Sequence, residues 1–447
     1  MDYQKIIHAI NQYQKKLCQL SDEIWHKPEL KFEEHFASEL LANFLESEGF
    51  EIVKPLADLP TAFSASFSRN VSENSPTIGI LGEYDALPTM SQKANIARPD
   101  AIEENGPGHG CGHNMLGVGA VAAALAARDF LKETNTPGTV IFFGCPAEEG
   151  GGGKVVMKKN GAFDAIDAAI TWHPSNQFAA KTANTLATTT NDFRFSGRSS
   201  HAAKSPHLGR SAVDAVEIMN VGVNYLREHV PSDVRMHYAW VETGGSAPNV
   251  VQSHATIRYQ IRAAEAATMQ DVYKRVQKIA EGACLMTETS VEIIPGTTYL
   301  NLIPSLTISR KMHQHAEAMG APVYTEDELA FSREILTETV GAEKAKKFAS
   351  PVATQIDPYT EAPAIHSAST DVGDVSWLVP TVEYRSATWV HGTEGHTWPV
   401  VAQGLSVTAH KGMLHAGMVM AATAIDLFQD PETVTAAKAE LHNRIHS

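Results

Sequence analysis

The sequence predicts an α/β fold in which a mostly parallel sheet is covered by helices and a smaller α+β domain is inserted. Short apolar runs of the buried-strand type lie at 77–81, 139–143 and 168–171. These runs alternate with helical segments, which is typical of a parallel sheet with helices on its faces. Near residue 186 the pattern changes to the alternation of half-buried strands, which indicates that a second kind of domain begins there.

The larger domain opens with a helical region, residues 3–48, whose apolar residues recur at helical spacing. A helix rich in small residues, 115–131, lies between the first two apolar runs. After the insert the chain becomes helix-rich again. We expect a strand at 381–390 and a final helix at 409–428.

The inserted domain is predicted to span residues 186–296 as strand, helix, two strands, helix and strand, a ferredoxin-like order. The expected helices lie at 211–228 and 268–283, and the two middle strands at 234–242 and 254–263. The larger domain is then discontinuous and comprises residues 1–185 and 297–447.

Composition excludes several classes of protein. Hydrophobic residues make up 43% of the 447 residues and charged residues 19%, as in ordinary globular proteins. The net charge of −15 would repel a phosphate backbone, so we expect no nucleic-acid partner. No apolar run reaches the roughly 18 residues of a membrane span. Four widely spaced cysteines and the lack of a signal-peptide pattern favour a cytoplasmic protein.

Metal-binding side chains follow each of the three apolar runs. The first run leads into GEYDALP, which contains Asp85, and the second into GCPAEEGGGG, which contains Glu148 and Glu149. The third leads into WHP, which contains His173. Ligands of open α/β sheets bind outside the carboxyl ends of the strands. We therefore expect these side chains to meet at one edge of the sheet.

The segment GPGHGCGHNMLG is the sharpest local motif. Cys111 and His113 are separated by one glycine on a turn that precedes the small-residue helix. A thiolate and an imidazole on such a turn can bind one or two divalent ions. The alternative is a buried free cysteine beside a histidine that caps the helix.

The adjacent carboxylates Glu148 and Glu149 suggest a division of labour. One would coordinate a metal, and its neighbour would act as a general base toward water. The alternative is a solvated acidic turn, but an apolar strand before it and a glycine run after it favour a site. A further ligand is expected in HGTEGHTWP, where spacing alone does not decide between His391 and His396.

These motifs resemble the metal-dependent aminoacylase and carboxypeptidase superfamily in its amidohydrolase branch. The resemblance covers nearly the whole chain and includes GEYDALP, GHGCGHN, PAEEGGGGKV, WHP, FSGRSSHAAKSPHLGRSA, GGSAPNVV and GTEGHTW in the family's order. The CGHN version is most similar to the B-type group of the aminobenzoyl-glutamate hydrolases. Asn114 stands where other amidohydrolases of the branch usually carry aspartate, which leaves the substrate open.

The resemblance implies a role for each residue of the expected metal site. Glu148 becomes the general base, and Asp85 hydrogen-bonds a ligand and orients it. Cys111 is shared between two metal ions. The implied ligands are Cys111, His113, Glu149, His173 and His396.

The resemblance also implies that the insert is a lid and dimerisation domain. His201 would steady the developing oxyanion, often in the active site of the partner subunit. Asn249 and Arg262 would hold a substrate carboxylate, for which the arginine fork is suited. For each there is a plainer alternative: a surface histidine, a turn asparagine and an arginine on a half-exposed strand.

The expected enzyme hydrolyses the amide bond of an N-acyl amino acid, an aminobenzoyl-glutamate-like conjugate or a dipeptide with two divalent ions, Mn²⁺ or Zn²⁺. It is expected to be a homodimer, or a heteromer with a related subunit. One alternative is a hydrolase with Cys111 as nucleophile and His113 or His109 as base. The other is a catalytically silent metal-binding partner subunit.

Overall fold

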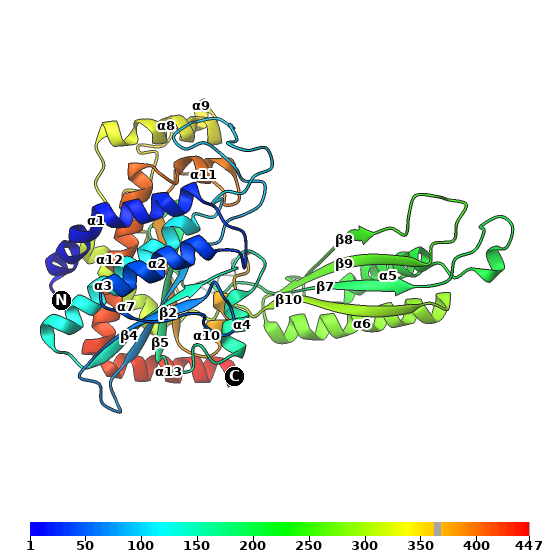
Figure 1. The fold of residues 1–447 in the computed structure, drawn as a ribbon, viewed down its shortest axis with the longest axis horizontal. Coiled ribbons are helices and arrows are strands. Elements are labelled where there is room, and N and C mark those ends of the chain that lie inside the picture. The colour runs from blue at the N-terminus through cyan, green and yellow to red at the C-terminus, as the bar shows by residue number, and fades with distance from the viewer. Residues whose placement is uncertain (362–367, 447) are drawn as a thin grey trace. The chain divides into compact units, whose positions relative to one another are not determined.

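The computed structural model describes residues 1–361 and 368–446. The chain forms two compact units: the first contains Met1–Ala183 and most of the chain after Ile303, and the second contains Asn184–Leu302 with a short segment ending at Gly373 (Figure 1). The helices outside the insert are α1 (Tyr3–His26), α2 (His35–Ser47), α3 (His113–Thr134), α4 (Gly153–Lys159), α7 (Leu306–Met319), α8 (Glu326–Val340), α9 (Ala342–Ala345), α10 (Val372–Ser376), α11 (Trp398–Gln403), α12 (Val407–Gln429) and α13 (Pro431–His446).

The first unit is built on a seven-stranded sheet with the order β1-β2-β4-β3-β5-β11-β6. Strands β4, β3, β5 and β11 are parallel neighbours, whereas β1, β2 and β6 pair antiparallel at the two edges. The parallel core confirms the predicted fold class. The strands are β1 (Glu51–Val53), β2 (Phe63–Arg69), β3 (Thr77–Glu83), β4 (Gly138–Cys145), β5 (Ala168–Ser175), β6 (Ala179–Ala180) and β11 (Thr381–Ala387).

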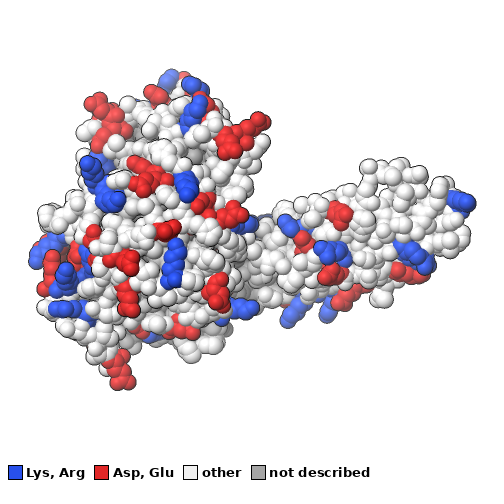
Figure 2. All heavy atoms as spheres, in the orientation of Figure 1, with Lys and Arg blue, Asp and Glu red and all other residues white. Residues whose placement is uncertain are grey.

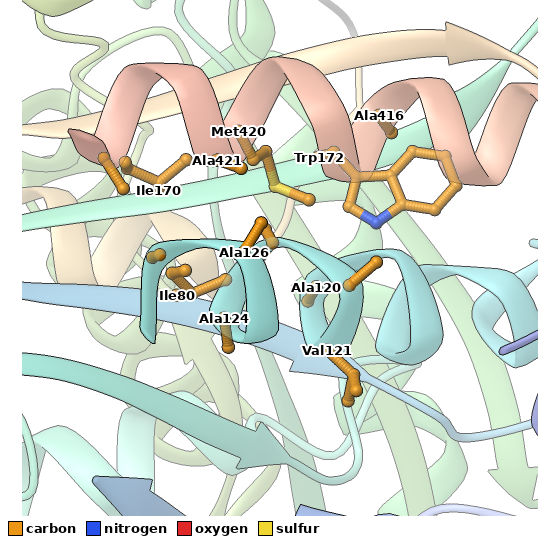
Figure 3. Packing of buried hydrophobic residues seen from close by; sticks show 14 of the residues in the cluster. Ile80, Ala120, Val121, Ala124, Ala126, Ile170, Trp172, Ala416, Met420 and Ala421 are labelled. Atoms are coloured by element: carbon orange, nitrogen blue, oxygen red, sulfur yellow. The ribbon is translucent and has the colours of Figure 1, made fainter. Parts of the chain in front are cut away.

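Small residues let α3 and α12 lie side by side in the core of this unit (Figure 3). A Cβ atom on Gly417 of α12 would lie 2.8 Å from Ala122 Cβ of α3, and one on Gly119 would lie 2.7 Å from the Trp172 ring. Either would force packed atoms apart. The glycines therefore set the close approach of the two helices and of β5.

Helix α3 is the one helix of the described chain that is long and apolar enough to cross a membrane. In the structure 89% of its most apolar window is buried inside the protein, so its apolar surface is covered by other elements. Figure 2 shows acidic and basic side chains interspersed over one face of the protein.

The second unit is a four-stranded antiparallel sheet of order β10-β7-β9-β8, with helices α5 and α6 packed on it. Numbered along the insert, this is the order 4-1-3-2, which is ferredoxin-like as predicted. Its elements are β7 (Ala187–Ser196), α5 (Ala212–Leu226), β8 (Arg235–Glu242), β9 (His254–Ala263), α6 (Ala266–Thr287) and β10 (Ser290–Tyr299), with single 3₁₀ turns at Pro206–Leu208 and Arg227–His229.

Two predictions about the helices were wrong. The helical region 3–48 is broken between α1 and α2, where Pro28 cannot continue the backbone hydrogen-bond ladder. The helix expected to be the last is followed by α13. Pro431 at its first position and Asp430, whose carboxylate accepts from the Thr433 hydroxyl at 2.7 Å, are ordinary helix-start signals.

Candidate metal centre

The parallel strands deliver the predicted side chains to one edge of the sheet. Strand β3 ends at Glu83, two residues before Asp85, and β4 ends three residues before Glu148. His173 lies in β5 and is paired in register with Arg385 of β11. Because these strands run in the same direction, their carboxyl ends lie together.

A glycine turn positions Cys111 and His113. Gly112 has φ = 75°, a left-handed conformation that favours glycine, and a Cβ there would lie 3.0 Å from Pro174, which would have to shift. His113 begins α3 immediately after this turn. As a result Cys111 Sγ lies 3.3 Å from His173 Nε2.

Hydrogen bonds made by the Nδ1 atoms fix the ring orientations of His173 and His113. His173 Nδ1 donates to the Pro174 carbonyl at 2.7 Å, which can only accept, so Nε2 carries the lone pair. Burial, aided by the nearby Arg385, lowers the pKa of His173 well below its usual range. His113 Nδ1 donates to Asp85 Oδ1 at 2.8 Å. This arrangement is the one that metal-binding histidines usually have.

Asp85 links the turn that carries Cys111 and His113 to the turn that carries Glu148 and Glu149. Its Oδ2 accepts the backbone N–H of Glu149 at 2.8 Å while its Oδ1 binds His113. Burial alone would raise the pKa of Asp85, but His113, the Glu149 N–H and Lys154 together keep the pKa below its ordinary value. Asp85 is therefore an ionised acceptor that orients one predicted ligand and the backbone of another.

The structure distinguishes His396 from His391, between which the sequence spacing did not decide. His396 Nε2 lies 3.1 Å from Glu149 Oε1, and the His396 N–H donates to the Gly110 carbonyl at 2.8 Å. His391 stacks on Phe348 with ring centroids 5.0 Å apart and lies in none of the described candidate metal groups.

Three overlapping groups of side chains have ligand atoms within 4.8 Å of one another. The first two share Cys111 and together contain all five predicted ligands, and the third contains the predicted general base, Glu148. The buried Nε2 of His113 makes no hydrogen bond within the described chain. A buried imidazole nitrogen without a hydrogen-bond partner, in one group with a cysteine sulfur and in another with two carboxylates, suits a divalent cation. The groups are Cys111–His113–His173, Cys111–Glu149–His396 and Glu83–His113–Glu148.

Sequence reasoning missed Glu83 and Lys154. The buried Glu83 carboxylate lies 2.6 Å from Lys154 Nζ and 3.4 Å from His113 Nε2. Lys154 is fully buried, so the pair neutralises two charges beside the site. Glu83 could have been found, because it is an acidic residue at the carboxyl end of the predicted strand, where the other metal-binding side chains were expected.

A second charged cluster, formed by Lys181, Glu383 and Arg385, lies on the strand next to His173 and beside it. Glu383 Oε1 lies 2.7 Å from Arg385 Nε and 3.3 Å from Lys181 Nζ. Burial alone would raise the pKa of Glu383, but Arg385 and Lys181 lower it to about 2. Sequence reasoning missed this cluster too, since Lys181 and Glu383 are brought together only by the β11–β6 pairing.

The insert carries its three predicted residues at two places. His201 is exposed and its Nδ1 accepts the N–H groups of Ala203 and Lys204, while the Asn249 carbonyl accepts from Ala202 at 2.9 Å. Arg262 lies near the other end of β9, where it donates to Gln260. The structure thus brings His201 and Asn249 together, and Arg262 lies apart from them within the insert.

Comparison with known proteins settles the family. The sequence profile of peptidase family M20/M25/M40 matches residues 79–341. The chain belongs to this family. It is 43% identical to the B-type chain of the p-aminobenzoyl-glutamate hydrolase of Escherichia coli (strain K12), over 96% of this chain and 92% of that protein. It is 30% identical to the Xaa-Arg dipeptidase of Mus musculus, over 96% and 90%.

The fold is also similar to that of solved structures. A dinuclear metal-binding peptidase of the M20 family from Bacillus subtilis matches with a TM-score of 0.62 at 16% identity, over 94% of this chain and 99% of that chain. The aminobenzoyl-glutamate utilization protein of Klebsiella pneumoniae matches with a TM-score of 0.59 at 17% identity, over 90% and 96%. The family assignment confirms the predicted enzyme class: the chain is a metal-dependent hydrolase of amide bonds.

Proposed function

We propose that this chain hydrolyses the amide bond of an N-acyl amino acid, with aminobenzoyl-glutamate as the first candidate substrate and a dipeptide as the second. The observation that carries the proposal is the pair of ligand groups sharing Cys111, with Glu148 beside them. The relatives support the substrate class, since one is named for aminobenzoyl-glutamate and another for a dipeptide.

We propose that the five ligands hold two divalent ions, with Cys111 shared between them. When bound, such ions supply Lewis acidity that acidifies a water and polarises the substrate carbonyl. The mixed thiolate, imidazole and carboxylate set accepts both Mn²⁺ and Zn²⁺. Elemental analysis of protein purified without added metal would identify the native ion. Activity that survives complete chelation would contradict the proposal.

The chain's own residues would then handle the proton. We assign the general base to Glu148, whose carboxylate takes the proton of the attacking water and returns it to the leaving nitrogen. Asp85 holds His113 by Nδ1 and Glu149 by its backbone N–H, so it keeps two ligands in place. The Lys154–Glu83 pair balances charge beside them.

We propose that the insert serves as lid and dimerisation domain, and that the protein is a homodimer. Strand β8 is an edge strand of its sheet and exposes Tyr238, Trp240 and Val241 by 44%, 39% and 52%. An exposed edge with apolar side chains is a template for pairing with another chain. A heteromer with a related subunit would use the same edge.

We further propose that His201 steadies the developing oxyanion in the active site of the partner subunit. We propose that Asn249 and Arg262 hold a substrate carboxylate, for which the arginine fork is suited.

The four cysteines are all free thiols, which fits a reducing compartment. We therefore propose a cytoplasmic location. Detection of the protein in an oxidising compartment, with any of these thiols in a disulfide, would contradict it.

The proposal is tested with a panel of N-acyl amino acids and dipeptides assayed in Mn²⁺ and in Zn²⁺. Glu148→Ala should retain metal and lose about 10²–10⁴-fold in kcat. Glu394→Ala is a matched control, since Glu394 is an exposed carboxylate in a neighbouring loop. Full turnover by Glu148→Ala would refute the role of this residue.

Two outcomes would support other functions. Irreversible inactivation by a thiol alkylating agent without any metal requirement would indicate Cys111 as a nucleophile. Against this, His109 Nε2 donates to the Ile24 carbonyl at 3.1 Å and burial lowers the pKa of His109 to about 4. A protein that binds metal but is inert over the whole panel would indicate a silent partner subunit.

A further inference from the structure

Glu34 is a buried carboxylate that sequence analysis did not single out. Its Oε1 accepts two backbone N–H groups, from Phe32 at 2.9 Å and from Ala147 at 2.8 Å. Its side chain is fully buried. The contact with Ala147 joins two segments that are 113 residues apart in the sequence.

Both amides belong to residues in a backbone conformation that L-residues rarely adopt. Phe32 has φ = 66° and Ala147 has φ = 58°. Such conformations persist only where surrounding contacts hold them. Ala147 is the residue immediately before Glu148, so its φ sets the direction in which the Glu148–Glu149 turn leaves β4.

The Glu34 carboxylate is not occupied in capping a helix, although Glu34 directly precedes α2. The first-turn amides of Phe36 and Ala37 are capped by Glu29, at 2.9 and 3.0 Å. The Glu29 carbonyl also accepts the Ala86 N–H at 2.8 Å. The segment 29–34 therefore contacts the chain on both sides of the site, next to Asp85 and next to Glu148.

The glycine run after Glu149 packs against the same segment. A Cβ on Gly151 would lie 2.6 Å from Ala147 Cβ and 2.9 Å from the Phe32 ring. Phe32 and Ala147, the two residues that Glu34 holds, therefore form the surface on which the turn lies.

We propose that Glu34 is a positioning residue, whose Oε1 holds Ala147 in its left-handed conformation and so places the Glu148 carboxylate for proton transfer. This proposal rests on the function proposed above for Glu148. In this proposal Ala147 is held by the acceptor oxygen of Glu34 and by the length of the side chain that carries this oxygen. The negative charge of Glu34 has no part in it.

Three substitutions separate these properties. Glu34→Gln keeps an acceptor oxygen at the same reach and removes the charge. Glu34→Asp keeps the charge but withdraws the oxygen by one methylene. Glu34→Leu removes both. The proposal predicts that glutamine preserves the function and that aspartate and leucine do not, whereas a role for the charge predicts the opposite order for glutamine and aspartate.

We expect Glu34→Asp and Glu34→Leu to lower kcat by about 100-fold with KM changed by less than about threefold, because a misplaced base affects the transition state more than substrate binding. Glu34→Gln should stay within about threefold of the wild type in both constants. Hydrogen exchange gives a readout without substrate: amides in 144–153 should exchange faster in the aspartate and leucine variants, while those of α12 are unchanged.

The exchange measurement keeps this proposal distinct from the proposed function. If the wild type hydrolyses nothing on the panel but exchange rises locally as described, the proposed function fails and Glu34 still positions the turn. Three results overturn the positioning role: full activity of Glu34→Asp, loss of activity in Glu34→Gln, or faster exchange throughout the chain in both of these variants.

Discussion

Replacement of Asp85 by asparagine tests how the metal centre is organised. The two Asp85 oxygens are used separately: Oδ1 accepts from His113 Nδ1 and Oδ2 from the Glu149 N–H, each at 2.8 Å. Asparagine has only one acceptor oxygen. Its amide group is a donor and would face either the His113 Nδ1–H or the Glu149 N–H, which are donors as well. Asp85→Asn therefore breaks one of the two hydrogen bonds and removes the charge from the other.

The size of the effect follows from the hydrogen bonds that are lost. A hydrogen bond to a charged group contributes about 1.5–3 kcal/mol. Since about 1.4 kcal/mol corresponds to a tenfold change in an equilibrium constant, the loss of one such bond corresponds to about 10–100-fold in metal affinity. Direct replacement of residues that orient metal ligands has an effect of about this size.

The assay is competition with a chelating dye, which gives the dissociation constants of both ions without substrate. Asp129→Asn is the matched control, because Asp129 also lies in a hydrogen bond, to Arg128 Nε at 2.8 Å, but near the other end of α3. Metal affinity of Asp85→Asn within about twofold of the control would refute the reasoning.

Four further predictions follow from particular contacts. His396→Ala should weaken metal binding in the same assay, whereas His391→Ala should bind metal as the wild type does, since His391 stacks on Phe348. The pKa of Glu34 is raised by burial from 4.5 to about 7, so the folded state holds this proton more tightly and stability falls as pH rises across that interval. The wild type should lose about 3 kcal/mol of unfolding free energy in this way. Because glutamine does not titrate, the difference in unfolding free energy between Glu34→Gln and the wild type should grow by that amount from pH 4.5 to pH 7. A difference that stays constant with pH would contradict this. Glu383→Leu leaves Lys181 and Arg385 without their carboxylate and should cost about 3–5 kcal/mol in urea unfolding at pH 7. Because the pKa of Glu383 is depressed to about 2, that difference should shrink as pH falls from 4.5 through 2. Trp240→Glu on the exposed β8 edge should yield monomers by sedimentation, and an unchanged mass would exclude this edge as the dimer contact.

The fold class was predictable because it depends on local patterns. Buried parallel strands require short apolar runs such as 77–81 and 139–143, and the half-buried strands of the insert require alternation. The structure confirmed the α/β core and the ferredoxin-like insert that these signals predict. Element ends were less predictable: the break at Pro28 was missed, although proline is a local signal.

The strand ends were sufficient to nominate Glu149 and His173, and the CGH turn to nominate Cys111 and His113, since the direction of parallel strands follows from their pattern. Only the tertiary structure placed His396 beside Glu149 and His391 against Phe348. Sequence spacing is silent on this choice, because both histidines lie in one glycine-rich loop whose path depends on its contact with Gly110.

Glu34, Glu83 and Lys154 show what local pattern by itself leaves open. Each is an ionisable residue that a sequence pattern would place on the surface, yet all three are buried. Burial of an ionisable side chain is stable only with partners of the right geometry. Those partners come from distant parts of the chain: the Ala147 amide for Glu34, and Lys154 for Glu83. The sequence determined which chemistry gathers at the sheet edge, and the tertiary structure decided which buried groups hold it in place.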